Sequence, residues 1–261
     1  MRVRNIEVGK RIGEAPEFRI YLGTMDDKQP VILKVAKTFE DGDILATEAS
    51  KFNTLRSFEE QVAGFEKKLG RKSSHYDWLF ARLLSSFLEP TQGDRRINVF
   101  MATDTDLSKL VPLKVMHANV EIDTRTSVWI LGRFFKFYSF FELLAKEVDG
   151  PIARYPVFSP DDYLIEPENH RLIYYNFSGE IADVIATDFV KVITKFMLNW
   201  FDVGDDTAEK KYCNLLQDFS KHGRNTFEEA HKEFYALVKE CWGIQYYPFA
   251  YRERGTITWK P

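Results

Sequence analysis

The 261-residue chain has little of what marks several protein classes. Two cysteines, Cys213 and Cys241, fit no metal-ligand spacing and no disulfide framework, so we expect inert thiols in a reducing compartment. A net charge of -3 gives no reason to expect nucleic acid or an anionic membrane as a partner. Residues 1 to 7 lack the apolar core of a signal peptide, and no internal repeat occurs. These absences predict a cytoplasmic protein.

One apolar run is long enough to raise the question of a membrane span. Residues 128 to 145 are rich in phenylalanine but are interrupted by Arg133, Lys136 and Glu142. With Ser139 and Lys146, these polar residues recur every three or four positions and form one polar stripe on a helix that is otherwise apolar. We therefore predict a helix over residues 125 to 146, capped by Asp123 or Thr124 and buried in protein rather than in lipid.

Apolar residues are abundant elsewhere. They make up 44% of the chain, with 22 Phe, 12 Tyr and 5 Trp, which is enough for a sizeable core in one large domain or two lobes. Residues 1 to 37 read as strands, residues 79 to 88 and 95 to 102 as two more, and most of the chain after residue 181 as helices.

Residues 155 to 179 carry the most informative pattern. Two short apolar runs, 163 to 165 and 172 to 175, enclose the polar segment Glu166-Pro167-Glu168-Asn169-His170, which favours a turn. The pattern predicts a hairpin. Asp161 and Asp162 come before it and Asn176 after it, and oxygen ligands that converge in this way typically hold Mg²⁺.

Near the N-terminus, Lys34 lies inside the apolar strand Val31-Ile32-Leu33-Lys34-Val35. Alternation places it on one face with Ile32 and Ala36, which favours a cleft over the plain alternative of a solvated lysine. A helix should begin near residues 41 to 44 and carry Glu48, for which a surface position is the plain alternative.

The order of these features resembles the protein-kinase fold, in which a His-Arg-Asp loop leads to Pro-Glu-Asn, a hairpin and Asp-Phe-Gly. Here Pro160-Asp161-Asp162 stands for Pro-Glu-Asn, and Asn176-Phe177-Ser178 stands for Asp-Phe-Gly. The His-Arg-Asp positions fall on Tyr155-Pro156-Val157. Val157 therefore replaces the catalytic aspartate and can neither accept nor donate a proton. The pattern looks most like the reduced kinase-like proteins of bacteria and phages.

The resemblance implies an ATP site in which Lys34 pairs with phosphates and Glu48 pairs with Lys34. Of the three glycines that would cover the phosphates only Gly13 is present, because Ala15 and Phe18 stand at the other two positions. Pro16 also removes a backbone N–H. The implied nucleotide-binding residues are Gly13, Ile20, Lys34, Glu48, Met101 and Ala102, and the implied metal ligands are Asp162 and Asn176.

After the hairpin, the sequence shows one more similarity to protein kinases and one more departure from them. Thr187-Asp188 resembles the aspartate that opens helix F and braces the catalytic loop, although a plain N-cap is the alternative. Only nine residues separate Asn176-Phe177-Ser178 from Asp188, and no Ala-Pro-Glu occurs. The segment that holds a peptide substrate in protein kinases is therefore shortened.

We expect an α+β, two-lobed kinase-like fold: an N-lobe over residues 1 to 102, with a five-stranded antiparallel sheet and one helix, and a mainly helical C-lobe over residues 103 to 261. The first functional hypothesis is a pseudokinase, a binding or regulatory module with an unknown protein partner. It would require no cofactor, and ATP and Mg²⁺ would bind weakly at most. The second is an atypical ATP-dependent phosphotransferase with Asp162 as metal ligand, and the third is an assembly protein on a different α+β fold.

Overall fold

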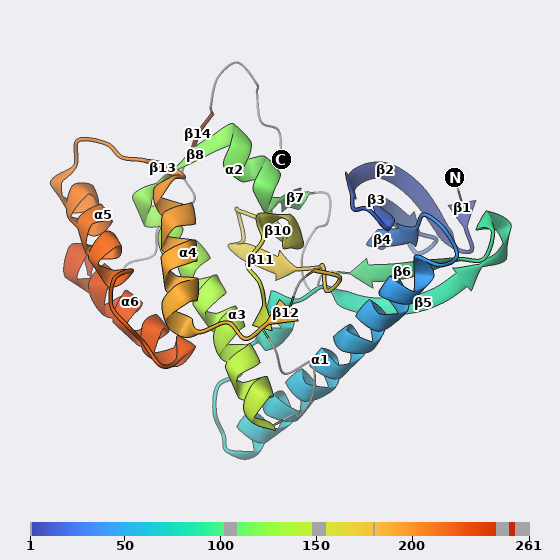
Figure 1. Ribbon diagram of the computed structural model, residues 1–261, viewed down its shortest axis with the longest axis horizontal. Coiled ribbons are helices and arrows are strands. Elements are labelled where there is room, and N and C mark those ends of the chain that lie inside the picture. The colour runs from blue at the N-terminus through green and yellow to red at the C-terminus, as the bar shows by residue number, and fades with distance from the viewer. Residues whose placement is uncertain (1, 102–108, 148–154, 180, 244–250, 254–261) are drawn as a thin grey trace. The chain divides into compact units, whose positions relative to one another are not determined.

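The computed structural model describes residues 2–101, 109–147, 155–179, 181–243 and 251–253 (Figure 1). The chain divides into two compact units. The first contains Met1–Pro112 and Ile173–Ser178, and the second contains Leu113–Leu172 and residues 179 to 260. One boundary between the units falls inside the second strand of the predicted hairpin, between Leu172 and Ile173.

The first unit is built on a six-stranded antiparallel sheet in the order β1-β2-β3-β4-β6-β5. Its strands are β1 (Arg2–Val3), β2 (Ile6–Glu14), β3 (Phe18–Met25), β4 (Pro30–Ala36), β5 (Arg82–Glu89) and β6 (Arg95–Met101). The unit also holds helix α1 (Gly42–Lys68), strand β7 (Val111–Pro112) and 3-10 turns at Tyr76–Leu79 and Pro90–Gln92. The sequence predicted five strands, and the short β1 is the sixth.

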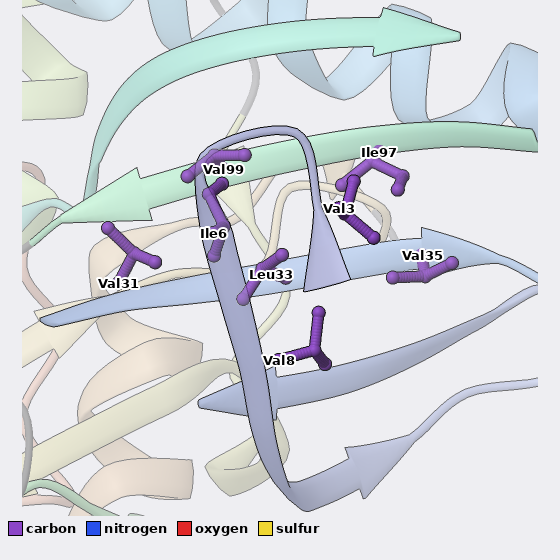
Figure 2. Close-up of a cluster of buried hydrophobic side chains, with 8 residues drawn as sticks. All are labelled: Val3, Ile6, Val8, Val31, Leu33, Val35, Ile97 and Val99. Atoms are coloured by element: carbon purple, nitrogen blue, oxygen red, sulfur yellow. The ribbon is translucent and has the colours of Figure 1, made fainter. Parts of the chain in front are cut away.

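One face of this sheet carries a cluster of buried aliphatic side chains (Figure 2). The cluster consists of Val3, Ile6, Val8, Val31, Leu33, Val35, Ile97 and Val99. Register shifts in the β2–β3 ladder after Val8 and Arg11 allow β2 to bend, because bulges increase local twist and curvature. Gly23 has no room for a side chain, since an added Cβ would lie 2.6 Å from Leu33 Cδ1.

Helix α1 packs against β5 and β6 of the same unit. Before it begins, the Thr38 backbone N–H donates to Asp41 Oδ2 at 3.0 Å, and the Asp41 N–H donates to Thr38 Oγ1 at 3.2 Å. Its buried positions, Leu45, Glu48, Ala49, Phe52, Leu55 and Phe58, follow the spacing of one helix face. The helix ends where Gly70 adopts a φ of 63° and donates its N–H to Lys67 O. The predicted helix position of Glu48 is therefore correct, and its side chain faces inward.

The second unit is mainly helical (Figure 1). Its helices are α2 (Leu113–Asn119), α3 (Ser127–Glu147), α4 (Ala186–Leu198), α5 (Thr207–Phe219) and α6 (Phe227–Trp242). Its strands are β8 (Val120–Asp123), β9 (Tyr155–Pro156), β10 (Tyr163–Glu166), β12 (Ile181–Ala182), β13 (Phe201–Asp202) and β14 (Tyr251–Glu253), and β11 (Arg171–Tyr174) crosses the unit boundary. The predicted hairpin is present as β10 and β11 with the turn between them.

Helix α3 forms the core of the second unit, as the phenylalanine-rich run predicted. Phe134, Phe135, Phe140 and Phe141 are fully buried, and α3 packs against α6. The buried Tyr138 hydroxyl donates to Pro156 O at 2.8 Å, so the helix is joined to β9 by a hydrogen bond in a water-free environment. Burial raises the pKa of the Tyr138 phenol well above its usual value.

Two local predictions need correction. The chain after residue 181 is not wholly helical, because β12 pairs antiparallel with β9, β13 pairs parallel with β8, and β14 pairs antiparallel with β8. Such two- and three-residue strands show no sequence periodicity. Residue Asp123 does act as a cap, but it accepts from the N–H of Arg125 at 2.7 Å and begins a 3-10 turn (Thr124–Thr126) that precedes α3.

Within the described residues, no helix is long and apolar enough to cross a membrane. Both cysteines are free. Burial raises the pKa of the Cys213 thiol to about 11 and also raises that of Cys241. Thiols of this kind are protonated and weakly nucleophilic at neutral pH, as the prediction of inert cysteines requires.

Candidate functional site

A lysine–glutamate pair lies at the centre of the first unit. Lys34 projects from β4 on the face opposite the aliphatic cluster, and its Nζ donates to Glu48 Oε1 of α1 at 2.5 Å. Both side chains have an exposed fraction of 0%. A buried charge is tolerated only when it is paired and hydrogen-bonded. The plain alternatives, a solvated Lys34 and a surface Glu48, are therefore wrong.

Glu48 is held by more than the lysine. Its Oε1 accepts the backbone N–H of Phe177 at 2.9 Å, and its Oε2 accepts from Asn98 Nδ2 at 3.1 Å. The same amide group of Asn98 donates to Leu45 O at 2.8 Å. Asn98 is fully buried on β6 and pairs in register with Lys34. The sequence prediction missed Asn98, although an asparagine inside an apolar strand is an unusual residue that marks such a position.

Asn176 joins the same set of side chains. Its Oδ1 accepts from Lys34 Nζ at 2.9 Å and from the Ser178 hydroxyl at 2.6 Å. We call Lys34, Glu48, Asn98 and Asn176 the lysine–glutamate cluster. The amide oxygen carries no charge and already accepts from three donors, including the Ser178 backbone N–H at 3.4 Å, which makes it a weaker ligand for a divalent cation than a carboxylate.

Three aromatic rings surround the lysine ammonium. The ring centroids of Phe18, Phe100 and Tyr175 lie 5.0, 5.5 and 5.2 Å from Lys34 Nζ. Phe18 is buried at the start of β3 and pairs in register with Ala36. Phe18 stands where the kinase resemblance expects a glycine, so a large side chain occupies the space beside the ammonium group.

Lys51, three residues after Glu48 on α1, fixes the backbone of the Asn-Phe-Ser segment. Its Nζ donates to Phe177 O at 3.2 Å and lies 5.5 Å from the Phe177 ring. Burial lowers the pKa of the Lys51 ammonium, and the carboxylate of Glu48 opposes part of that shift. Phe177 itself packs edge-on against Phe52 and Tyr174, with centroid distances of 5.4 and 5.2 Å. The sequence prediction missed Lys51.

The other predicted nucleotide-binding residues have mixed positions. Ile20 is buried on β3 and pairs in register with both Lys34 and Gly13, so these three lie across neighbouring strands. An added Cβ at Gly13 would lie 3.2 Å from Ile20 Cδ1. Met101 ends β6, and its sulfur accepts from Gln29 Nε2 at 3.3 Å. Ala102 lies outside the described residues.

In the second unit, the three positions that the resemblance assigns to His-Arg-Asp begin in β9. Val157 is half-buried and comes directly after β9, which pairs with β12. Asp162 has an exposed fraction of 5%, and its Oδ2 lies 3.2 Å from the position of an added Cβ on Gly179. Asp161 is exposed and pairs with Lys114 at 2.8 Å. Ser159 caps the short 3-10 turn Pro160–Asp162 by accepting from the Asp161 N–H.

Asp188 does not have the bracing role that the resemblance implied. Its side chain is 63% exposed and pairs with Lys191 of the same helix at 3.4 Å. The N-cap of α4 is Ile185, with no side-chain hydrogen bond, so Asp188 is not the cap either. It lies in the first turn of α4, where a carboxylate interacts favourably with the helix dipole.

Within the described residues, no group of three or more His, Cys, Asp or Glu side chains is arranged to hold a metal ion. No protein-family model matches the chain, and no curated protein matches it in sequence. Among solved structures, the chain is similar to that of vaccinia related kinase 3. The TM-score is 0.52 at 11% sequence identity, and the match covers 90% of this chain and 88% of that chain.

This likeness shows the fold. The chain has an α+β, two-lobed protein-kinase-like fold, with an antiparallel sheet and helix α1 in one lobe and a mainly helical second lobe. The third sequence hypothesis, a different α+β fold, is therefore wrong. At 11% identity the likeness says nothing about catalysis.

Proposed function

We propose that this chain is a pseudokinase, a kinase-like protein without useful phosphoryl transfer that acts as a binding or regulatory module for a protein partner. The observation that carries the proposal is the lysine–glutamate cluster, in which Lys34 and Glu48 are paired but Asn176, at the position that the kinase resemblance assigns to a metal-binding aspartate, is a neutral amide. Phosphoryl transfer depends on metal ions that neutralise the phosphates and on a base that orients the acceptor.

Several features of the first unit weaken the fit for ATP and Mg²⁺. Lys34 Nζ is committed to Glu48 and Asn176, and a bound phosphate would have to displace one of these contacts. Phe18 fills the space beside the ammonium, and Pro16 leaves one backbone N–H fewer to contact phosphate. When bound in an active kinase, Mg²⁺ supplies charge neutralisation. Asn176, which stands where the kinase resemblance expects the metal-binding aspartate, has no negative charge to hold this ion.

Thermal melting of the protein with ATP, in the presence and absence of Mg²⁺, tests this proposal. A ligand at about a hundred times its dissociation constant adds about 2.7 kcal/mol to the free energy of unfolding. We expect millimolar ATP to give the same small shift in melting temperature, or none, with and without Mg²⁺, and we expect no release of ADP. A large shift that requires Mg²⁺, together with ADP release, would contradict the proposal.

An engineered carboxylate makes this test sharper. Asn176→Asp restores a charged metal ligand beside Lys34, so we expect the variant to gain a Mg²⁺-dependent shift that the wild type lacks. Asn169→Asp is the matched control, because it makes the same amide-to-carboxylate change at an exposed residue of the β10–β11 turn. An equal Mg²⁺-dependent shift in melting temperature in the two variants would mean that Asn176 does not occupy a metal-binding position.

Asp162 supports a second candidate function, an atypical ATP-dependent phosphotransferase. A carboxylate with only 5% exposure next to Gly179 is an unusual group that a metal ion would stabilise. Under this alternative, Asp162→Asn would remove ADP release with a small-molecule acceptor, whereas Asp161→Asn would leave it unchanged. Under the pseudokinase proposal, none of the three proteins releases ADP.

We also propose a cytoplasmic location. The support is the state of the thiols, since Cys213 and Cys241 are both free and unreactive, as is usual for proteins of a reducing compartment. A fractionation experiment with the tagged full chain tests this location.

A further inference from the structure

A cavity of about 320 Å³ lies within the second unit, and none of its described lining residues belongs to the lysine–glutamate cluster. Helix α3, the turn between β10 and β11, and helix α6 supply its walls. Four of its lining side chains are basic: Arg133, Lys136, His170 and His231. The described lining residues include no carboxylate. We call the cavity lined by these four side chains the basic cavity.

The wall on the hairpin side is rigid. The ring of His170 stacks on that of Trp129 with centroids 4.7 Å apart and an interplanar angle of 9°. The Arg133 Nε–H donates to His170 O at 3.3 Å. His170 adopts a φ of 53°, a left-handed conformation that few residues other than glycine adopt. The stacking and the hydrogen bond thus hold one imidazole and one guanidinium in fixed positions.

The wall on the α6 side depends on a glycine. An added Cβ at Gly132 would lie 2.5 Å from the Tyr235 hydroxyl oxygen. The phenol can therefore lie directly on the backbone of α3 only because residue 132 has no side chain. The ring of Tyr235 also packs against that of His231, with centroids 5.0 Å apart.

Two polar atoms in this lining lack a hydrogen-bond partner among the described residues. They are Trp129 Nε1 and His231 Nε2, and both are buried from solvent. The indole N–H is a donor only, and the imidazole nitrogen becomes a donor when it carries a proton. Buried polar atoms are nearly always paired, so two unpaired atoms in one cavity point to a ligand that accepts hydrogen bonds.

The basic groups of the cavity, together with burial, disfavour one another's charged forms. Burial, and then the neighbouring Arg171, lower the pKa of Arg133. Burial and Arg133 lower the pKa of His170. Burial and Lys136 lower the pKa of His231 to about 4, opposed by Glu228, whose carboxylate pairs with the exposed Lys232. Groups that depress one another's charge in this way would be stabilised by a bound anion.

We propose that the basic cavity is a binding site for a phosphate monoester, a ligand that is independent of nucleotide binding in the first unit and goes beyond the proposed pseudokinase function. A phosphate monoester carries about -1.5 to -2 charges at pH 7 and three acceptor oxygens. Arg133 and Lys136 match that charge, and the imidazole and indole groups of the lining add hydrogen-bond donors. A carboxylate has one charge and two oxygens, and it would leave part of this donor set unused.

Calorimetric titration of the full chain with inorganic phosphate, and separately with sulfate, tests the site. We expect saturable binding that falls about tenfold in Lys136→Gln and in His231→Gln, the effect of losing one charge-assisted hydrogen bond. Lys146→Gln is the control, because it removes the same charge from the exposed end of the same helix α3. We expect the control to bind like the wild type.

The dependence on pH provides a second measurement. Sulfate stays a dianion between pH 5.5 and 7.5, whereas His231 is neutral in the free cavity over most of this range. A bound anion favours the protonated imidazole, so binding takes up a proton and sulfate affinity rises as pH falls. His231→Gln should weaken this rise. The groups facing His231 are Lys136 from α3, and Glu228 and Tyr235 from α6.

Two ligands distinguish the possible sources of the phosphate group. Glycerol phosphate represents a small metabolite, and a short phosphoserine peptide represents a modified protein side chain. Tighter binding of either ligand than of inorganic phosphate supports the proposal and identifies the source. The proposal is overturned if none of these anions binds at millimolar concentration, or if Lys136→Gln and His231→Gln bind as tightly as Lys146→Gln.

Discussion

The lysine–glutamate cluster and the basic cavity both contain charged side chains, but these side chains have different partners in the two places. In the lysine–glutamate cluster, one cation and one carboxylate are fully buried, and each has additional hydrogen-bond partners. In the basic cavity, the cations lie together, no described lining residue is a carboxylate, and two donor positions are unmatched. Breaking a closed ion pair leaves a buried charge without its partner, whereas a group of neighbouring cations is suited to binding an anion. The comparison predicts that removal of a charged side chain lowers the stability of the first unit, whereas removal of a titratable side chain from the cavity favours the folded state at low pH.

The largest effect is expected in the first unit. Lys34→Met leaves the carboxylate of Glu48 buried without its cation, which costs about 3–5 kcal/mol of stability. Urea unfolding measures this loss. In Lys34→Met/Glu48→Gln no charge remains, and most of the loss should be recovered. A single variant as stable as the wild type would show that the pair is not buried in solution.

A smaller effect, with a defined dependence on pH, is expected in the second unit. The pKa of His231 is about 4 in the folded chain, below its ordinary value of 6.5, so the unfolded chain takes up the proton first as pH falls. The stability contributed by neutral His231 is present above about pH 6.5 and is lost as pH falls toward 4. Its total is roughly 3 kcal/mol.

His231→Gln isolates this term, since glutamine does not titrate. We expect the difference in unfolding free energy between wild type and variant to change in the variant's favour between pH 7 and pH 4. Urea unfolding at several pH values without anions measures it. A constant difference over that range would mean that the imidazole is not buried beside a cation.

The smallest effect concerns the coupling inside the cavity. Lys136 is one cause of the lowered pKa of His231, so Lys136→Gln should raise that pKa. An NMR titration of the imidazole protons measures the shift. Lys146→Gln should leave the pKa of His231 unchanged, and the same shift in both variants would indicate a long-range field instead of a shared cavity.

The sequence was most informative where one residue stood out from its element. A lysine in an apolar strand, a glutamate on a helix and the Asn-Phe-Ser segment after a hairpin pointed to Lys34, Glu48 and Asn176, and the structure joins all three. The hairpin itself was marked by its polar turn. These features are local, so the order of elements was enough to relate them.

Other parts of the site depend on register and packing, which local patterns do not determine. The contact of Asn98 with Glu48 requires the pairing of β4 with β6, and the position of Phe18 beside Lys34 requires the pairing of β3 with β4. Asp188 was assigned by order alone, and its exposed side chain shows that order does not fix the direction of a residue on a helix.

The basic cavity lay beyond sequence reasoning for a related reason. Arg133 and Lys136 were identified only as a polar stripe on a buried helix, while His170 and His231 come from a turn and a distant helix. No spacing in the chain relates these three segments. Their common location follows from the packing of α3 with α6.

Gly132 has a consequence for how the second unit tolerates change. Because the Tyr235 hydroxyl touches the α3 backbone at this position, any larger residue there would rotate the phenol outward while the helix stayed in place. The tip of a tyrosine side chain moves at far lower cost than helix backbone does. The position of Tyr235 in the cavity lining thus depends on a single missing methyl group, and a substitution at Gly132 would alter the shape of the cavity while preserving the fold.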